Sequence, residues 1–142
     1  SKEERLDLLE NFYTLYKKRW DELSNAITLE MGAPKDFATK LQVGAGAAHI
    51  KTFIKYLKEF KFDRLVNNQL QNQRIIYEPK GVCALITPWN WPMNQVCLKV
   101  IPALASGCTM VLKPSEIAPL SSMILAEIIH EVKFPKGVFC TI

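Results

Sequence analysis

The chain has 142 residues, of which 49% are apolar and 23% are charged, a composition typical of a globular protein with one domain. Its formal net charge of +4 is small, and lysines such as Lys51, Lys55 and Lys58 are spaced as on a solvated helix face, so we expect neither nucleic acid nor a membrane as a partner. No apolar run approaches the ~18 residues of a membrane-spanning helix and no signal peptide opens the chain, so we expect a cytoplasmic location.

The first predicted elements are helices. Apolar residues recur every three or four positions over residues 1–31, and Ser1 and Glu4 have the spacing of a capping box. This pattern fits either one helix or two helices with a break near Lys18. A glycine and a proline end the region, and a second helical stretch is predicted over residues 35–60.

The second helical stretch contains Gly44-Ala45-Gly46-Ala47-Ala48-His49, which matches a G-x-G-x-x-G dinucleotide-binding fingerprint only in part. His49 stands where the third glycine is required, and no strand precedes the segment, although the fingerprint needs a strand, a turn and a helix in that order. Small residues that let two helices pack closely are the better explanation.

The rest of the chain predicts a parallel sheet. Residues 63–72 are polar and are interpreted as a loop, and residues 74–78 are interpreted as a short strand. Three short apolar runs then alternate with two helical patterns, which predicts right-handed β–α–β connections. The predicted strands cover residues 82–86, 109–112 and 138–142, and the predicted helices cover residues 94–106 and 120–132.

The expected fold class is therefore α/β, with N-terminal helices followed by the first βαβαβ part of a Rossmann-like parallel sheet. We divide the chain into a helical segment over residues 1–62, a loop and short strand over residues 63–80, and a partial dinucleotide-binding unit over residues 81–142. Open sheets of this kind bind ligands at the carboxyl ends of their strands.

The loop after the first strand of this unit reads Thr87-Pro88-Trp89-Asn90-Trp91-Pro92. Its two prolines fix φ, so the carboxamide between them is held in one conformation. An amide N–H at the carboxyl end of a strand can donate to a developing oxyanion. The alternative is that Asn90 only caps the helix that follows.

The loop after the second strand reads Lys113-Pro114-Ser115-Glu116. A carboxylate at the end of the second strand of a dinucleotide-binding fold commonly accepts hydrogen bonds from ribose hydroxyls. The alternative is an exposed salt bridge between Lys113 and Glu116, which contributes little to stability.

The four cysteines, Cys83, Cys97, Cys108 and Cys140, form no C-x-x-C pair, and they lie in or beside apolar segments. We expect them to be buried, reduced thiols. No metal site is expected, because the chain has only two histidines and neither is near a cysteine.

Together these segments resemble the aldehyde dehydrogenase family. The resemblance is carried by the two loops, by Lys99, and by Pro119, and it extends over essentially the whole chain. Its other segments are residues 30–34, 78–82, 102–107 and 135–139. It implies oxidation of an aldehyde to a carboxylic acid through a cysteine thiohemiacetal, with NAD as the expected cofactor and NADP as a possible one.

The resemblance also implies roles for single residues. Asn90 would be the catalytic residue that donates its amide to the thiohemiacetal oxyanion, and Lys99 would lie beside the substrate tunnel as a proton carrier or in a buried salt bridge. Trp91, Gln95 and Leu98 would line that tunnel. The cofactor-binding residues would be Ile86, Thr87, Pro88, Trp89, Lys113, Pro114, Ser115 and Glu116.

The chain departs from the family in what it lacks. None of its cysteines lies in the Gly-Gln-x-Cys context of the nucleophile, and the general-base glutamate is also absent. We therefore expect an N-terminal part of a longer homodimeric or homotetrameric enzyme, inactive alone, whose aldehyde is selected by residues outside this chain. The alternatives are a non-catalytic nucleotide-binding or oligomerisation module and a CoA-acylating relative.

Overall fold

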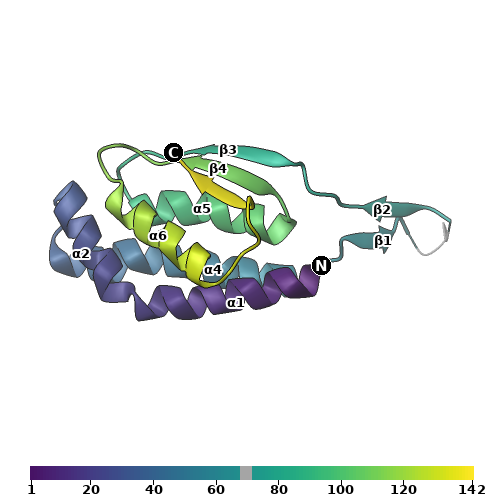
Figure 1. Cartoon of the computed structure of the whole chain (residues 1–142). Coiled ribbons are helices and arrows are strands. Elements are labelled where there is room, and N and C mark those ends of the chain that lie inside the picture. Colours follow the sequence, from purple (N-terminus) through teal and green to yellow (C-terminus); the bar gives the residue numbers. More distant parts are fainter. Residues whose placement is uncertain (68–71) are drawn as a thin grey trace.

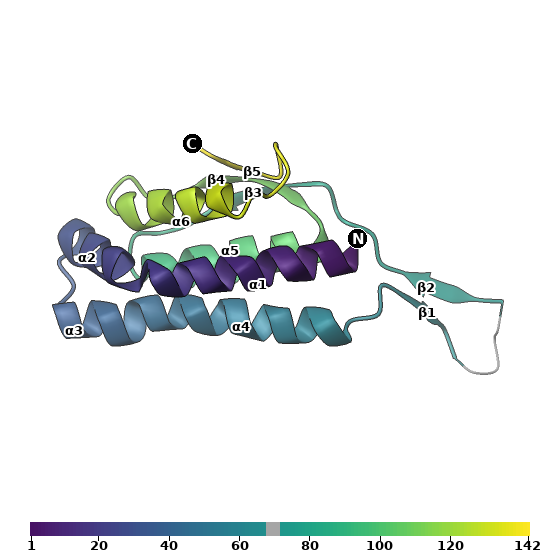
Figure 2. The same cartoon turned by 60° about the horizontal axis from the view of Figure 1, so that its bottom comes forward.

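The computed structural model describes residues 1–67 and 72–142 and has helices on one side of a small parallel sheet (Figure 1). A second pair of strands extends away from this body as a ribbon. Seen from the side, α1 and α4 lie on one side of α5, and the strands of the parallel sheet lie on the other (Figure 2). The expected α/β class and the helix-then-sheet order are confirmed.

The N-terminal region forms two helices, α1 (Lys2–Lys18) and α2 (Trp20–Met31), with the break at Arg19. The predicted capping box is present, because the Ser1 hydroxyl accepts from the Glu4 amide at 3.1 Å and the Ser1 amino group donates to the Glu4 carboxylate at 2.6 Å. Gly32 ends α2 in the left-handed region, with φ of 71°, where the missing side chain removes a steric penalty.

The second helical stretch consists of α3 (Lys35–Phe37), a π-helical turn η1 (Ala38–Gln42) and α4 (Val43–Glu59). Side chains of α2 bond to the widened turn: the Trp20 indole N–H donates to the Thr39 carbonyl at 3.0 Å, and the Ser24 and Thr39 hydroxyls lie 2.6 Å apart. These bonds join α2 to the π-helical turn.

Gly46 lets α1, α4 and α5 approach closely. A Cβ atom at this position would lie 2.3 Å from the Tyr16 hydroxyl oxygen and 3.2 Å from the Cys97 sulfur. Tyr16 is fully buried and donates its hydroxyl to the Val43 carbonyl at 2.9 Å, so it is held in place. The close-packing explanation for the small residues of this segment is confirmed at Gly46.

The parallel sheet contains β3 (Val82–Ile86), β4 (Thr109–Lys113) and β5 (Phe139–Thr141), in the order β3-β4-β5. Helices α5 (Pro92–Ser106) and α6 (Leu120–Glu131) connect them, and Gly107 ends α5 with φ of 86°. The predicted βαβαβ pattern is confirmed. The helices cover one face only, so Val82 and Ile86 on β3 are 74% and 70% exposed.

The interpretation of residues 63–72 as a loop is wrong at its start. Asp63–Leu65 form β1, which pairs antiparallel with β2 (Arg74–Ile76), and residues 68–71 of the predicted loop lie outside the described residues. The Arg74 side chain donates to the Asp63 carboxylate at 2.7 Å. Cross-strand pairs of this kind hold a strand whose residues are too few and too polar to show an alternating pattern.

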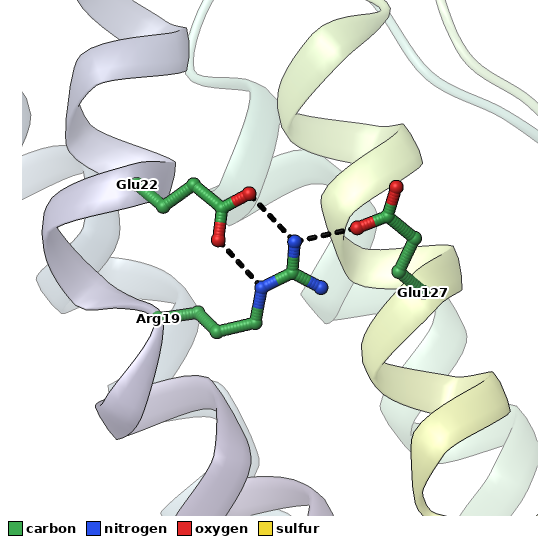
Figure 3. Close-up of polar contacts among 3 residues, drawn as sticks. All are labelled: Arg19, Glu22 and Glu127. Carbon is green, nitrogen blue, oxygen red and sulfur yellow. Dashed lines mark hydrogen bonds and ion pairs between the residues drawn. The ribbon is translucent and has the colours of Figure 1, made fainter.

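Helix α6 is bound to the N-terminal helices by charged side chains. Arg19 donates to Glu22 at 2.6 Å and reaches Glu127 of α6 at 2.5 Å (Figure 3). Glu30 of α2 accepts from the Leu120 amide and from the Ser121 hydroxyl, each at 2.5 Å. A carboxylate at the N-terminus of α6 satisfies free N–H groups and complements the helix dipole.

Gly46→Ala should lower the free energy of unfolding by about 1–3 kcal/mol, because the added Cβ would overlap the buried Tyr16 ring. The matched control is Gly44→Ala on the same helix, where nothing lies within 4 Å of the added Cβ. The control should raise stability by up to ~1 kcal/mol through helix propensity. Urea unfolding of both variants measures the difference, and equal effects would contradict the packing role of Gly46.

Candidate functional site

The parallel pairing of β3 with β4 places their two polar loops next to each other. Ile86 is opposite Lys113 in the register, and the buried Thr87 donates its amide to the Lys113 carbonyl at 3.2 Å. This hydrogen bond continues the pairing one step beyond β3. The structure thus brings together the two segments that the sequence singled out.

The Asn90 amide is exposed and has no hydrogen-bond partner among residues 1–67 and 72–142. The alternative role as a helix cap is wrong: Trp91 occupies the N-cap position of α5, and no side chain donates or accepts there. Pro92 takes the first helical position, which suits proline because its missing N–H has no partner in the first turn. The Asn90 side chain therefore remains available to a ligand.

Trp91 is held in an unusual conformation. Its φ of 71° lies in the left-handed region, which is uncommon for a bulky residue and marks a backbone that its surroundings hold in place. The indole meets the Phe37 ring edge-on, with 5.2 Å between ring centroids. The N-terminal helices thus contact the loop directly and fix the residue next to Asn90.

The other predicted tunnel residues lie on the first turns of α5. Gln95 is half-buried and Leu98 is exposed, and their three-residue spacing places them on one helix face. Asn94, in the first turn of α5, shares a hydrogen bond with His49 of α4, with 2.8 Å between the Asn94 side-chain oxygen and His49 Nε2. Lys99 is half-buried and has no ion-pair partner in the described part of the chain, so the buried salt bridge considered for it is absent there.

The loop after β4 presents charge to solvent. Lys113 Nζ lies 3.4 Å from Glu116 Oε2, so the ion pair considered as an alternative is present, with both side chains largely exposed. The backbone N–H of Glu116 and the ammonium of Lys113 hold the pKa of the Glu116 carboxyl below its ordinary value. Exposed pairs of this kind are weak, so both groups can turn to a ligand at little cost.

The other residues predicted to bind the cofactor lie at the same carboxyl ends of β3 and β4. Pro114 is buried, and the Ser115 hydroxyl accepts from the Ile117 amide at 3.2 Å, which stabilises the turn after Lys113. Ile86, Pro88 and Trp89 are exposed beside it. An exposed apolar strip next to a carboxylate and an ammonium fits a nucleotide, which has a ring system, ribose hydroxyls and phosphates.

Two contacts at the site were not found by sequence reasoning: Trp91 with Phe37, and Asn94 with His49. The partners lie 54 and 45 positions apart, and no local pattern joins them. The only local signal was His49, a polar residue at the end of the small-residue segment 44–48.

Hollows of about 500 and 280 Å³ lie away from these loops. The larger is lined by the start of α1, the end of α5 and the segment before β5, and the smaller by aromatic residues near the ribbon. The candidate site is therefore an open sheet edge. In the described residues, no three His, Cys, Asp or Glu side chains gather as metal ligands, and no helix is long and apolar enough to cross a membrane.

All four cysteines are free thiols, but they are not all buried as expected. Cys97 and Cys108 are buried, Cys83 is half-buried, and Cys140 is exposed. Cys140 pairs in register with Val111 and faces the side of the sheet that no helix covers. Burial raises the pKa of the Cys97 thiol well above its ordinary value.

Comparisons with known proteins identify the family of this chain. The family model described as the aldehyde dehydrogenase family matches residues 1–142. The chain is 51% identical over 140 residues to 3-succinoylsemialdehyde-pyridine dehydrogenase from a Pseudomonas species, covering 98% of this chain and 28% of that protein. The chain thus spans less than a third of the length of this curated relative.

Solved structures of relatives have the same fold. An aldehyde dehydrogenase from Bartonella henselae superimposes with a TM-score of 0.97 at 52% identity, covering 100% of this chain and 30% of that one. A mutant of aldehyde dehydrogenase C from Pseudomonas syringae, in complex with NAD+ and octanal, superimposes with a TM-score of 0.94 at 42% identity. That match covers 100% of this chain and 28% of the other.

Proposed function

The chain belongs to the aldehyde dehydrogenase family, and we propose that it forms the N-terminal part of the cofactor-binding domain of an enzyme that oxidises an aldehyde to a carboxylic acid with NAD(P). The observation that carries this proposal is the Thr87–Lys113 hydrogen bond, which holds the Asn90 loop against the Glu116 loop. One loop has a group suited to the reacting carbonyl, and the other has groups suited to a nucleotide.

Asn90 stabilises charge during the reaction. Attack of a cysteine thiolate on the aldehyde carbon places negative charge on the carbonyl oxygen, and the Asn90 amide N–H donates to it. Two features support this role: the Asn90 amide is exposed without a partner in the described residues, and the rings of Trp91 and Phe37 fix the neighbouring backbone. A donor held in advance needs no reorganisation when the charge develops.

Residues at the carboxyl ends of β3 and β4 and in the loops that follow would hold the cofactor. The donor set fits NAD: the Glu116 carboxylate suits ribose hydroxyls, Lys113 suits a phosphate, and the exposed side chains of Ile86 and Pro88 suit a flat ring. When bound, NAD supplies the hydride acceptor. Thr87, Trp89, Pro114 and Ser115 complete the proposed cofactor set, and Trp91, Gln95 and Leu98 form this chain's share of the aldehyde tunnel.

Other properties are proposed from the family. The partner is a small-molecule aldehyde, the full-length enzyme is a homodimer or homotetramer, and its location is cytoplasmic. The NAD+ and octanal complex of the Pseudomonas syringae relative supports an aldehyde and NAD for this site.

The 142-residue chain alone should not oxidise aldehydes, because none of its cysteines lies in the nucleophile context of the family and the general base is absent. Incubation with NAD+ and a short aldehyde should give no rise in the absorbance of reduced cofactor. Turnover that persists through repurification would contradict the proposed division of the active site.

In the full-length enzyme, Asn90→Ala should lower kcat by about 10²–10³, the usual effect of losing one oxyanion donor. NAD affinity should change little, because the amide acts on the reacting oxygen. Asn11→Ala is the control, since Asn11 is an exposed asparagine on α1, and it should leave both quantities unchanged. An unchanged kcat with weakened NAD binding in Asn90→Ala would reassign Asn90 to cofactor positioning.

The full-length enzyme should prefer NAD to NADP because of Glu116. Its carboxyl is ionised at neutral pH, where it repels the 2′-phosphate of NADP and accepts from the 2′-hydroxyl of NAD. Glu116→Gln should reduce the ratio of kcat/KM for NAD over NADP, mainly by improving NADP. The control is Glu59→Gln at the exposed end of α4.

Two outcomes would contradict this role of Glu116: a wild-type preference for NADP, or a ratio that Glu116→Gln does not change. Lys113 acts against the preference for NAD, because its ammonium lies 3.4 Å from the Glu116 carboxylate and can turn to the 2′-phosphate of NADP.

A further inference from the structure

Two cysteines lie on neighbouring strands at the end of the sheet opposite the two loops. Cys83 is the second residue of β3, and Cys108 immediately precedes β4. Val82 is opposite Thr109 in the register, so Cys108 lies one residue before this first pair. Both side chains pack on the helix-covered side of the sheet.

The surroundings make the two thiols unequal. The Ser106 hydroxyl lies 3.4 Å from the Cys108 sulfur and shares its proton between that sulfur and the Ala103 carbonyl, which is 3.0 Å away. This hydroxyl lowers the pKa of the Cys108 thiol, against the opposing effect of burial. Burial, followed by the contact with Cys108, raises the pKa of the Cys83 thiol. The Ser106 hydroxyl thus favours the thiolate form of Cys108, whereas burial disfavours the thiolate form of Cys83.

A small molecule can reach Cys108. This residue lines the hollow of about 500 Å³, together with Arg5 and Leu8 of α1 and Lys133 and Pro135 of the segment before β5. The hollow is large enough for a small organic molecule. Gly107, beside Cys108, leaves room for the Arg5 guanidinium, which would lie 2.6 Å from a Cβ at that position.

We propose that Cys83 and Cys108 form a dithiol site that a small disulfide, such as glutathione disulfide, converts into an intramolecular disulfide. The placement of the two cysteines on the same side of adjacent strands, the hydroxyl beside Cys108 and the hollow that Cys108 lines carry this proposal. It is independent of the function proposed above.

The exchange occurs in two steps. The Cys108 thiolate attacks one sulfur of glutathione disulfide, so a Cys108–glutathione bond forms, the original S–S bond breaks, and one glutathione thiolate leaves. The Cys83 thiol then loses its proton and attacks the Cys108 sulfur, which releases the second glutathione. Two electrons pass from the protein thiols to the small disulfide, and the two protons go to the two released thiols.

The other two cysteines serve as internal controls. Cys97 is fully buried beside Tyr16 and Gly46, where a disulfide has no access. Cys140 is exposed on the opposite side of the sheet, where it pairs with Val111 and has no second thiol beside it among the described residues. Cys140 can therefore take one glutathione but cannot release it by internal attack.

The test uses the full-length protein, reduced, desalted and treated with glutathione disulfide at pH 8. Remaining thiols are blocked with iodoacetamide, and the peptides are mapped by mass spectrometry without reduction. We expect a linked peptide pair joining Cys83 to Cys108, alkylated Cys97, and Cys140 either alkylated or carrying one glutathione. Free, alkylated Cys83 and Cys108 after this treatment would overturn the proposal, as would a lasting glutathione adduct on Cys108 beside a free Cys83.

Two variants separate the steps. In Cys83→Ser, Cys108 should keep one glutathione, because the second thiol is missing. In Cys140→Ser, the Cys83–Cys108 link should form as in the wild type. If Cys83→Ser does not fold, the wild-type peptide map and Cys140→Ser still decide the outcome.

Discussion

The parallel pairing of β3 with β4 is the constraint on which the candidate site depends. Each strand has only five residues, and their register, continued by the Thr87 amide on the Lys113 carbonyl, places two loops separated by 26 positions at one edge. Parallel neighbours cannot be joined by a tight turn, so the chain must cross back through a helix. That helix is α5, and its first turns also carry the proposed tunnel residues.

Helix α5 is in turn held by the N-terminal helices. Gly46 allows α4 to approach the Tyr16 ring and the Cys97 sulfur, and the aromatic contact between Phe37 and Trp91 reaches the loop itself. Helix α6 is bound to the same helices through Arg19 and Glu30. The helical half thus supports both helices that cross over the sheet. A substitution in the core of the N-terminal helices can therefore act on the Asn90 loop through packing contacts, even where the substituted residue does not contact that loop.

The sequence predicted the parts of the fold that have a strong local signal. The run 82–86 predicted a strand correctly, although its residues are half-buried or exposed rather than buried. Glycines such as Gly107 mark helix ends because they adopt positive φ without penalty. Strand β1 was missed because its three residues depend on pairing with β2. The exposure of Cys140 was missed because an apolar run does not reveal that only one side of the sheet is covered.

In the candidate site, too, features with a local sequence signal were predicted, and features that depend on tertiary contacts were not. The two loops were identified because prolines, a carboxamide and a charged pair at strand ends are unusual in local sequence, and the register then confirmed their proximity. The choice between a capping and a free role for Asn90 could not be made from sequence, since it depends on Trp91 entering the left-handed region against Phe37. The backbone of Trp91 is therefore the feature that leaves the Asn90 carboxamide without a partner among residues 1–67 and 72–142, because a cap at position 90 would have used its Oδ1 to accept from an N–H of the first turn of α5.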